Sequence, residues 1–366
     1  MAGSEFGTIL RVATWGESHG PGVGVVLDGC PAGLPLKEED IQSYLDRRKP
    51  GQSRFTTARA EADQVEILSG VFEGKTTGTP VSMIVRNTDQ RSRDYGNLME
   101  LYRPGHADYT FDCKYGFRDY RGGGRSSGRE TIGRVAAGAV AKKFLESLGI
   151  QVRAYTSAIG GISIDREKFC WSDMEENRLY MPDREAAARA EAFLEQKMSQ
   201  QDSAGGIVEC VISGMPPGVG EPVFEKLDGN LAKAMMSIGA VKGVELGDGF
   251  LAAESSGSEN NDGFLMEKGQ IKKRTNHSGG VLGGMSDGSD ILVRVAFKPT
   301  PSISRSQKTV TRSGEETEIE IRGRHDPVIV PRAVVVVEAM AALTAADMLL
   351  LSMTSRLDRI QEFFRK

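Results

Sequence analysis

One stretch of the chain combines flexible backbone with fixed positive charge. Residues 119–130, DYRGGGRSSGRE, hold three consecutive glycines among Arg121, Arg125 and Arg129. Glycine lets backbone N–H groups approach a ligand closely, and the guanidinium of arginine donates a planar fork of hydrogen bonds that suits phosphate or carboxylate. The stretch therefore predicts a cradle for an anion.

The same stretch leads into a predicted helix. Ser127 and Glu130 have the spacing of a capping box, and Gly149 is the expected end of the helix. Helix N-termini favour anions through free N–H groups and the helix dipole, which supports the anion cradle. One face of the helix should be apolar, with Ile132, Val135, Ala136, Ala139, Val140 and Phe144.

The two common phosphate-binding glycine motifs do not fit. A dinucleotide fingerprint built on Gly122 and Gly124 needs a glycine where Ser127 stands, and a P-loop needs Lys-Ser/Thr where Arg129 and Glu130 follow Gly128. The histidines are scattered singly, so no metal site is expected. They are His19, His106, His277 and His325.

Two of these histidines lie in polar settings rich in glycine. His19 is in GESHG, and His106 is in RPGHAD, three residues after Arg103. Histidine titrates near pH 6.5, so beside anion-binding arginines it can act as a general acid. A hydrogen-bonded turn histidine is the alternative for each. Ser18 beside His19 does not make a hydrolase triad, because a triad needs spatial geometry rather than adjacency.

Further basic clusters occur along the chain at 46–59 (DRRKPGQSRFTTAR), 298–302 (KPTPS) and 322–327 (RGRHDP). A solvated helix end, an ordinary loop and a helix cap by Asp326 are the respective alternatives. If the clusters converge, the pocket they form must hold several negative charges at once.

Composition limits the class of protein. The chain has 366 residues, a net charge of −4 and a pI near 5.8, which argues against a general nucleic-acid binder. Its four cysteines are far apart and no signal peptide is evident, so we expect reduced thiols and a cytoplasmic location. The first residues, MAGSEF, resemble a cloning scar, so no structure is expected from them.

Strands and helices mix without strict alternation and no linker is evident, which predicts a single α+β domain. The apolar segment 333–351 is interrupted by Glu338 and Asp347, so it is expected to be a buried core helix rather than a membrane span. Residues 254–264 are expected to form a flexible loop. Strands are expected within 8–14, 22–29, 65–74, 80–87, 151–164, 205–216 and 289–302, helices within 36–48, 182–201 and 224–238, and a hairpin around Ser313-Gly314.

Five motifs in this order resemble the signatures of the chorismate synthase family: GESHG, DRRKPGQSRFTT, RPGHADYT, DYRGGGRSSGRET and GRHDP…EAM. The resemblance extends over essentially the whole chain, and motifs of this length are specific in combination. It implies one domain over residues 1–366, a β-α-β sandwich with a helical core between antiparallel sheets, assembled as a homotetramer.

The resemblance also implies a lyase reaction of the shikimate pathway, the last common step of aromatic amino-acid biosynthesis. Phosphate and a ring hydrogen are eliminated from 5-enolpyruvylshikimate 3-phosphate to give chorismate. Reduced FMN is required without net redox change. NADPH enters only as the source of flavin reduction, in members with an intrinsic reductase; otherwise an external flavin reductase is the partner. No nucleic acid or membrane partner is expected.

Site residues follow from the resemblance position by position. His19 would protonate or stabilise the departing phosphate, His106 would tune the protonation of the reduced flavin, and Asp326 would assist proton removal by way of flavin N5. Substrate-binding positions are Ser18, Arg48, Arg54, Arg129 and Arg324, of which Arg48 and Arg54 also match arginines assigned to a nicotinamide nucleotide. FMN-binding positions are Arg125, Ser126, Ser127, Gly239, Ala240, Gly283, Lys298, Pro299, Thr300, Pro301, Ser302 and Arg324.

Two positions depart from the family pattern: Gly239 stands where many members have asparagine, and Pro301 where serine is common. Other functions remain open at this stage. A flavin-dependent reductase, or another lyase acting on a phosphorylated acid, would be revealed by nicotinamide oxidation coupled to FMN. A nucleic-acid-binding module would show a salt-dependent shift with RNA or DNA.

Overall fold

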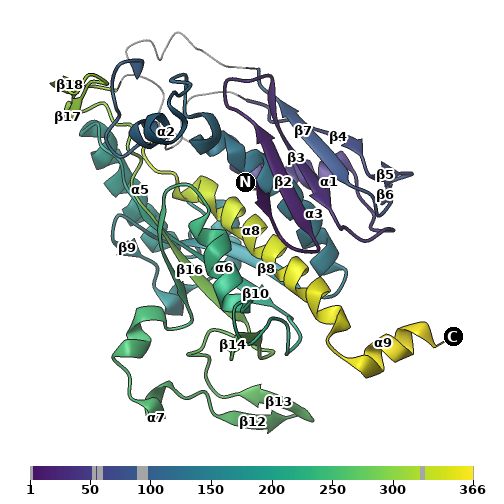
Figure 1. Ribbon diagram of the computed structural model, residues 1–366. Coiled ribbons are helices and arrows are strands. Elements are labelled where there is room, and N and C mark those ends of the chain that lie inside the picture. The colour runs from purple at the N-terminus through teal and green to yellow at the C-terminus, as the bar shows by residue number, and fades with distance from the viewer. Residues whose placement is uncertain (1–2, 52–54, 56–60, 89–97, 322–325, 366) are drawn as a thin grey trace.

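A computed structural model describes residues 3–51, 55, 61–88, 98–321 and 326–365, in which long helices lie between two antiparallel sheets (Figure 1). The first sheet has the order β1-β2-β3-β7-β4, and every neighbouring pair is antiparallel. Its strands are β1 (Glu5–Phe6), β2 (Arg11–Gly16), β3 (Gly22–Asp28), β7 (Val81–Arg86) and β4 (Val65–Ser69).

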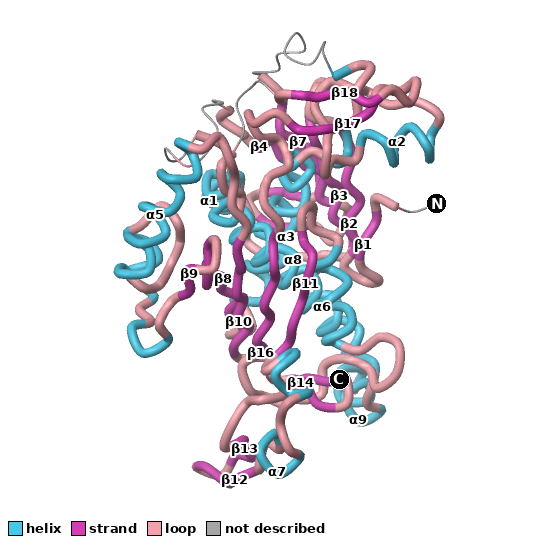
Figure 2. The backbone as a smooth tube through the Cα atoms, turned by 90° about the vertical axis from the view of Figure 1, so that its left-hand side faces the viewer, coloured by secondary structure: helices cyan, strands magenta, loops and turns pink. Residues whose placement is uncertain are grey.

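The second sheet has the order β11-β16-β10-β8-β9 and is also antiparallel (Figure 2). Its strands are β11 (Val241–Leu246), β16 (Ile291–Phe297), β10 (Gly206–Ser213), β8 (Gln151–Ile159) and β9 (Ile162–Ser163). Every segment predicted to be a strand contributes to these sheets, whereas β1 and β11 lie outside the predicted segments.

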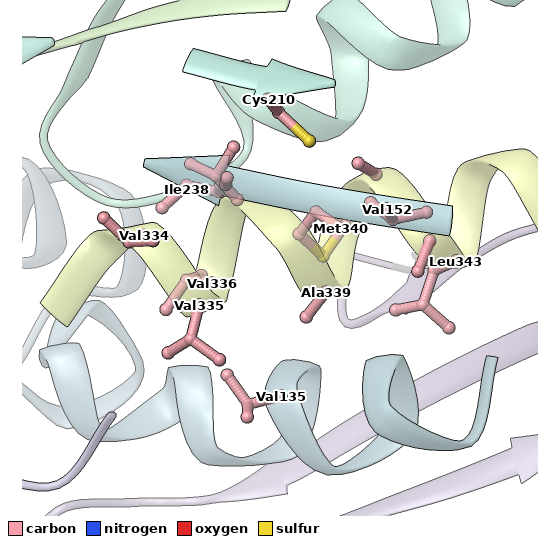
Figure 3. Close-up of a cluster of buried hydrophobic side chains, with 14 of the residues drawn as sticks. Val135, Val152, Cys210, Ile238, Val334, Val335, Val336, Ala339, Met340 and Leu343 are labelled. Atoms are coloured by element: carbon pink, nitrogen blue, oxygen red, sulfur yellow. The ribbon is translucent and has the colours of Figure 1, made fainter. Parts of the chain in front are cut away.

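Four helices fill the space between the sheets: α1 (Glu38–Arg48), α3 (Thr131–Glu146), α6 (Leu227–Met236) and α8 (Val330–Leu351). Helix α3 packs on β3 of the first sheet, α8 packs on β8 and β10 of the second, and α3 and α8 pack against each other. Figure 3 shows this contact, with Val135 of α3 facing the valines of α8. The predicted α+β sandwich with a helical core is thus the observed fold.

The remaining elements lie around this sandwich. They are helices α2 (Asp108–Tyr115), α4 (Trp171–Glu176), α5 (Arg184–Ser199), α7 (Gly257–Asn260) and α9 (Leu357–Phe364), and the two-stranded pairs β5 (Val71–Phe72) with β6 (Lys75–Thr76), β12 (Phe264–Glu267) with β13 (Gln270–Lys273), β14 (Val281–Leu282) with β15 (Met285–Ser286), and β17 (Gln307–Val310) with β18 (Glu316–Ile319).

The apolar segment 333–351 is a core helix, as predicted. Among the described residues, the helical stretch Val330–Thr354 is the one helix long and apolar enough to cross a membrane, yet 83% of its most apolar window is buried inside the fold. Its two acidic residues have partners. Glu338 pairs with Arg47 of α1 and Lys142 of α3, and Asp347 accepts the backbone N–H groups of residues 8–10 at 2.7–2.9 Å.

Three expectations differ from the structure. Glu130 does not complete a capping box, because its carboxylate accepts from Arg134 while Ser127 caps a short 3₁₀ turn that precedes α3. Glu5 and Phe6 at the end of MAGSEF form β1, which pairs with β2, so these two residues take part in the first sheet. The segment 254–264 contains α7, closed by a capping box between Ser256 and Glu259; the mobility of this loop stays a prediction.

Candidate active site

A cavity of about 1460 Å³ lies between the two sheets. Its walls come from β1 and β2 of the first sheet, the ends of β11 and β16 of the second, and the N-terminal halves of α3 and α8. Segments that are far apart in the sequence therefore meet at one place, which is what convergence of the basic clusters required.

Most of the predicted site residues line this cavity: Ser18, His19, Arg48, His106, Arg125, Ser126, Ser127, Arg129, Gly239, Ala240, Lys298, Thr300, Pro301, Ser302 and Asp326. Pro299 lies between two lining residues without itself contributing to the wall. Gly283 is in the turn of the β14–β15 hairpin, which precedes the first residue of β16. The cavity contacts the last residue of β16, Phe297, at the opposite end of the strand. Seven residues of strand span roughly 20 Å, so Gly283 is not brought into this cavity. Arg54 and Arg324 lie outside the described residues.

The glycine run forms a tight loop against His19. Gly122 has φ +74°, and a Cβ added there would lie 2.6 Å from two atoms of the His19 ring and 2.8 Å from Ser18 Oγ. No residue with a side chain fits at that position without moving the histidine. The run therefore serves close packing against a predicted catalytic group, in addition to any approach to a ligand.

His19 lies in a turn that several hydrogen bonds hold in place. Ser18 Oγ is 3.0 Å from His19 Nδ1, and Ser18 is almost fully buried. Asn87 donates to the carbonyls of Glu17 and Gly20 at 2.9 and 2.7 Å. The turn is thus rigidly tied to the end of β7.

The guanidinium of Arg125, a predicted FMN ligand, reaches the first sheet. It donates to the carbonyl of Gly16 at 3.1 Å, and to the hydroxyl and carbonyl oxygens of Thr14 at 2.6 and 3.2 Å. These contacts fix the glycine loop to β2, just before the turn that carries His19. Arg125 therefore helps to hold the glycine loop in place as well as lining the cavity.

His106 belongs to a buried hydrogen-bonded group at the start of α2. Its Nδ1 lies 3.0 Å from Asp108 Oδ1, and Asp108 also accepts from Arg103 in bidentate geometry at 2.7 Å. Arg103 and Asp108 are both nearly inaccessible to solvent. Although burial opposes ionisation, hydrogen bonds from Arg103 and His106 hold the pKa of Asp108 well below its ordinary value.

Arg48 and Arg129 both form ion pairs with the carboxylate of Asp63. Asp63, whose side chain is fully buried, pairs with Arg48 and lies 3.0 Å from Arg129 Nη1, which is also 3.5 Å from Glu61. Burial opposes ionisation of Asp63, but the charges of the two arginines outweigh it and lower its pKa. Burial lowers the pKa of Arg48 to about 10, against the opposing charge of Asp63, so Arg48 stays charged at neutral pH.

Four residues that line the cavity each have a buried side-chain atom with no hydrogen-bond partner among the described residues: Arg48 Nε, Arg118 Nε, Arg129 Nη2 and Thr300 Oγ1. A buried polar atom without a partner costs about 1–3 kcal/mol. The residues around the cavity therefore keep hydrogen-bonding capacity that their described neighbours do not use.

Asp326 lies at the base of α8. Arg332 donates to its carboxylate at 2.5 Å and to the carbonyl of Arg48 at 2.9 Å. The start of α8 is thereby fastened to the end of α1. On the opposite wall, Ala240 adopts the left-handed region with φ 72°, and its carbonyl accepts from the backbone of Lys298 at 2.9 Å. Strained backbone of this kind is frequent at functional sites.

Sequence reasoning missed the residues that hold these groups. Asp63, Asp108 and Arg332 contact predicted site residues but were not among them. Asp108 had a local signal, since it lies two residues after His106 in the same motif. Asp63 had none, because its partners are distant in the sequence. Of the basic cluster at 46–59, Arg47 and Lys49 have ordinary ion pairs with Glu338 and Asp46.

The chain is similar to known proteins over nearly its whole length. The family model described as chorismate synthase matches residues 10–350. The chain is 65% identical over 366 residues to the chorismate synthase of Lachnospira eligens, and 64% identical over 366 residues to that of Agathobacter rectalis, in each case covering 100% of both chains. A crystal structure of a chorismate synthase matches with a TM-score of 0.76 and 34% identity, covering 98% of this chain and 97% of that one.

Proposed function

Since the chain belongs to the chorismate synthase family, and so to the carbon–oxygen lyases that act on phosphates, we propose that it catalyses the 1,4-anti elimination of phosphate from 5-enolpyruvylshikimate 3-phosphate to give chorismate. The observation that carries the proposal is the single cavity in which His19, His106 and Asp326 meet two buried arginines. The substrate would bring one phosphate and two carboxylates to these groups.

The cavity fits a flavin beside the substrate. Pockets for one small molecule usually measure about 300–1,000 Å³, so a volume of about 1460 Å³ has room for a second ligand. The unpartnered Thr300 Oγ1 and the backbone of residues 122–128 are the groups that would hold the FMN phosphate and its neighbours. When bound, reduced FMN would supply transient electron donation to the substrate, with no net redox change.

The protein's own groups would act at the leaving group and at the ring. Arg48 and Arg129, which line the cavity, would help to bind substrate anions. His19 would donate a proton to the departing phosphate, a role worth roughly 10²–10⁴-fold in rate. Asp326, held by Arg332, would take up a proton. Preorganised donors in a dry site stabilise developing charge most effectively.

The wider setting of the activity follows from the same proposal. We expect a homotetramer, a cytoplasmic location and the last common step of aromatic amino-acid biosynthesis. NADPH would serve only to reduce FMN, either on this protein or through an external flavin reductase.

The test is an anaerobic assay with 5-enolpyruvylshikimate 3-phosphate and dithionite-reduced FMN. Chorismate absorbance and phosphate release should rise together in equal amounts, and neither should appear with oxidised FMN. Arg129→Lys should lose most of this activity, because lysine cannot use both edges of a guanidinium. Arg121→Lys is the matched control, because Arg121 is exposed and pairs with Asp119. Absence of chorismate with reduced flavin would contradict the proposal.

A further inference from the structure

Several hydrogen-bond donors meet at the carboxylate of Asp108. Oδ2 accepts from the backbone N–H of Arg103 at 3.0 Å and from its Nε at 2.7 Å. Oδ1 accepts from Arg103 Nη2 at 2.7 Å and lies 3.0 Å from His106 Nδ1. Because the residue is 5% exposed, little solvent competes for these positions.

Arg103 also connects this group to the glycine loop. Its Nη2 donates to the carbonyl of Gly122 at 2.8 Å, and Gly122 is the residue packed against the ring of His19. One guanidinium therefore ties together the segments that carry the two cavity histidines. The tie fixes the orientation of Asp108 as well, since both of its oxygens are already occupied by Arg103.

This arrangement determines where a neutral His106 holds its proton. An ionised carboxylate only accepts hydrogen bonds, so the ring nitrogen facing Asp108 must be the protonated one. His106 Nδ1 is that nitrogen. The other nitrogen, Nε2, is then left without a proton and available in the cavity that His106 lines.

We propose that Asp108, clamped by Arg103, is a positioning residue for His106: it fixes the tautomer with the proton on Nδ1 and so presents Nε2 to the cavity as the proton-accepting nitrogen. The importance of this tautomer for turnover rests on the proposed function, but the tautomer itself does not. It is a property of the folded protein that can be measured without substrate or flavin.

Substitution of Asp108 by asparagine should reverse the tautomer. The amide oxygen should take the Oδ2 position, where Arg103 N–H and Nε meet, because the NH₂ group then opposes one Arg103 donor, Nη2, instead of two. The NH₂ group then faces His106 Nδ1, which can only accept. The proton of the ring must therefore move to Nε2.

The experiment is magic-angle-spinning NMR of protein labelled with ¹⁵N-histidine, at pH 9, where a histidine of ordinary pKa is neutral. The chain has only four histidines, and His106→Gln assigns the signal. In the wild type, His106 Nδ1 should give a protonated signal and Nε2 an unprotonated one. In Asp108→Asn these should exchange, and kcat should fall by about 10²-fold or more, the range of a lost acid–base contribution.

The chain offers a matched control. His277 Nδ1 lies 2.6 Å from Asp248 Oδ2 in a half-buried pair, and neither residue lines the cavity. Asp248→Asn should leave kcat unchanged and should not alter the His106 signals. Asp108→Glu, which keeps an acceptor, should retain at least part of the Nδ1-protonated population.

Two results would overturn the proposal. The first is a wild-type His106 with its proton on Nε2, which needs no variant to fold. The second is a folded Asp108→Asn protein that keeps the proton on Nδ1 while kcat falls, which would leave Asp108 a structural role only. If the wild type shows the expected tautomer but forms no chorismate, the proposed function fails and the assignment of Asp108 stands.

Discussion

Substitution of Gly122 by alanine is the most direct test of how the glycine run serves the site. The new Cβ would lie 2.6 Å from His19 Cε1 and Nδ1, whereas ordinary contacts begin at 3.4 Å. The ring must therefore retreat by about 0.8 Å. A misplacement of about 1 Å at a reacting group can cost on the order of 10²-fold in rate, so we expect kcat to fall by roughly 30- to 100-fold.

Stability should change much less than activity. The atoms in the way belong to the end of a side chain, which can move, and the φ of +74° adds a strain of about 1–2 kcal/mol for a residue with a Cβ. Gly116 supplies the matched control. Its φ is +80°, and an added Cβ would meet nothing within 4 Å. Gly116→Ala should carry the same strain without the displacement of His19.

The assay compares the two variants by thermal unfolding and by anaerobic turnover with reduced FMN. Similar losses of stability combined with a large loss of kcat in Gly122→Ala alone would support the reasoning. Equal activity in the two variants would refute it, because the contact with His19 would then have no catalytic consequence.

Three other predictions concern stability and are checked by denaturant unfolding. Gly138→Ala should lower the free energy of unfolding by about 1–3 kcal/mol, because its Cβ would lie 2.3–2.5 Å from Ala339 in the contact between α3 and α8. The same change at the exposed Gly229 of α6 should raise the free energy of unfolding by about 0.5–1 kcal/mol. Equal effects of the two changes would contradict close packing at Gly138. Glu338→Gln should lower the free energy of unfolding by about 3–5 kcal/mol, because it leaves Arg47 and Lys142 without their carboxylate partner in the core. An unchanged free energy of unfolding would show that these ion pairs do not contribute to stability. The pKa of Asp63 is lower in the folded protein than its unfolded value of 3.8. The stabilisation by its ionised carboxylate is therefore present above pH 3.8 and is lost as the pH falls through the folded pKa. The difference in free energy of unfolding between wild type and Asp63→Asn should narrow below pH 3.8, and a constant difference would argue against an ionised Asp63.

The fold was largely predictable because its elements carry strong local patterns. Strand alternation, the apolar length of α8 and the hairpin turn at Gly314 each depend on neighbouring residues only. The error at Glu130 has a local cause. Its carboxylate pairs with Arg134, one helical turn further along the chain. An ion pair at this spacing competes with a capping motif that is correct by spacing alone.

The motifs that carry the site residues were predictable from the sequence, but the residues that hold those side chains in place were not. His19, His106 and Arg129 lie in long motifs with unusual composition, and the structure brings them to one cavity. Asp63 is different, because a lone aspartate in EADQVEILSG gives no sign that it lies between two arginines 15 and 66 positions away. Pairing between distant segments is decided by the topology of the sheets, which no local pattern encodes.

The charge of the site shows why its binding groups are arginines. Asp63 and Glu61 offset the charges of Arg48 and Arg129. The carboxylate of Asp63 holds one edge of each guanidinium. Because the donors of a guanidinium are fixed in one plane, these ion pairs also fix the orientation of the rest of each group, in which Arg48 Nε and Arg129 Nη2 have no partner among the described residues. A lysine at either position would keep the charge but would lose this planar set of donors.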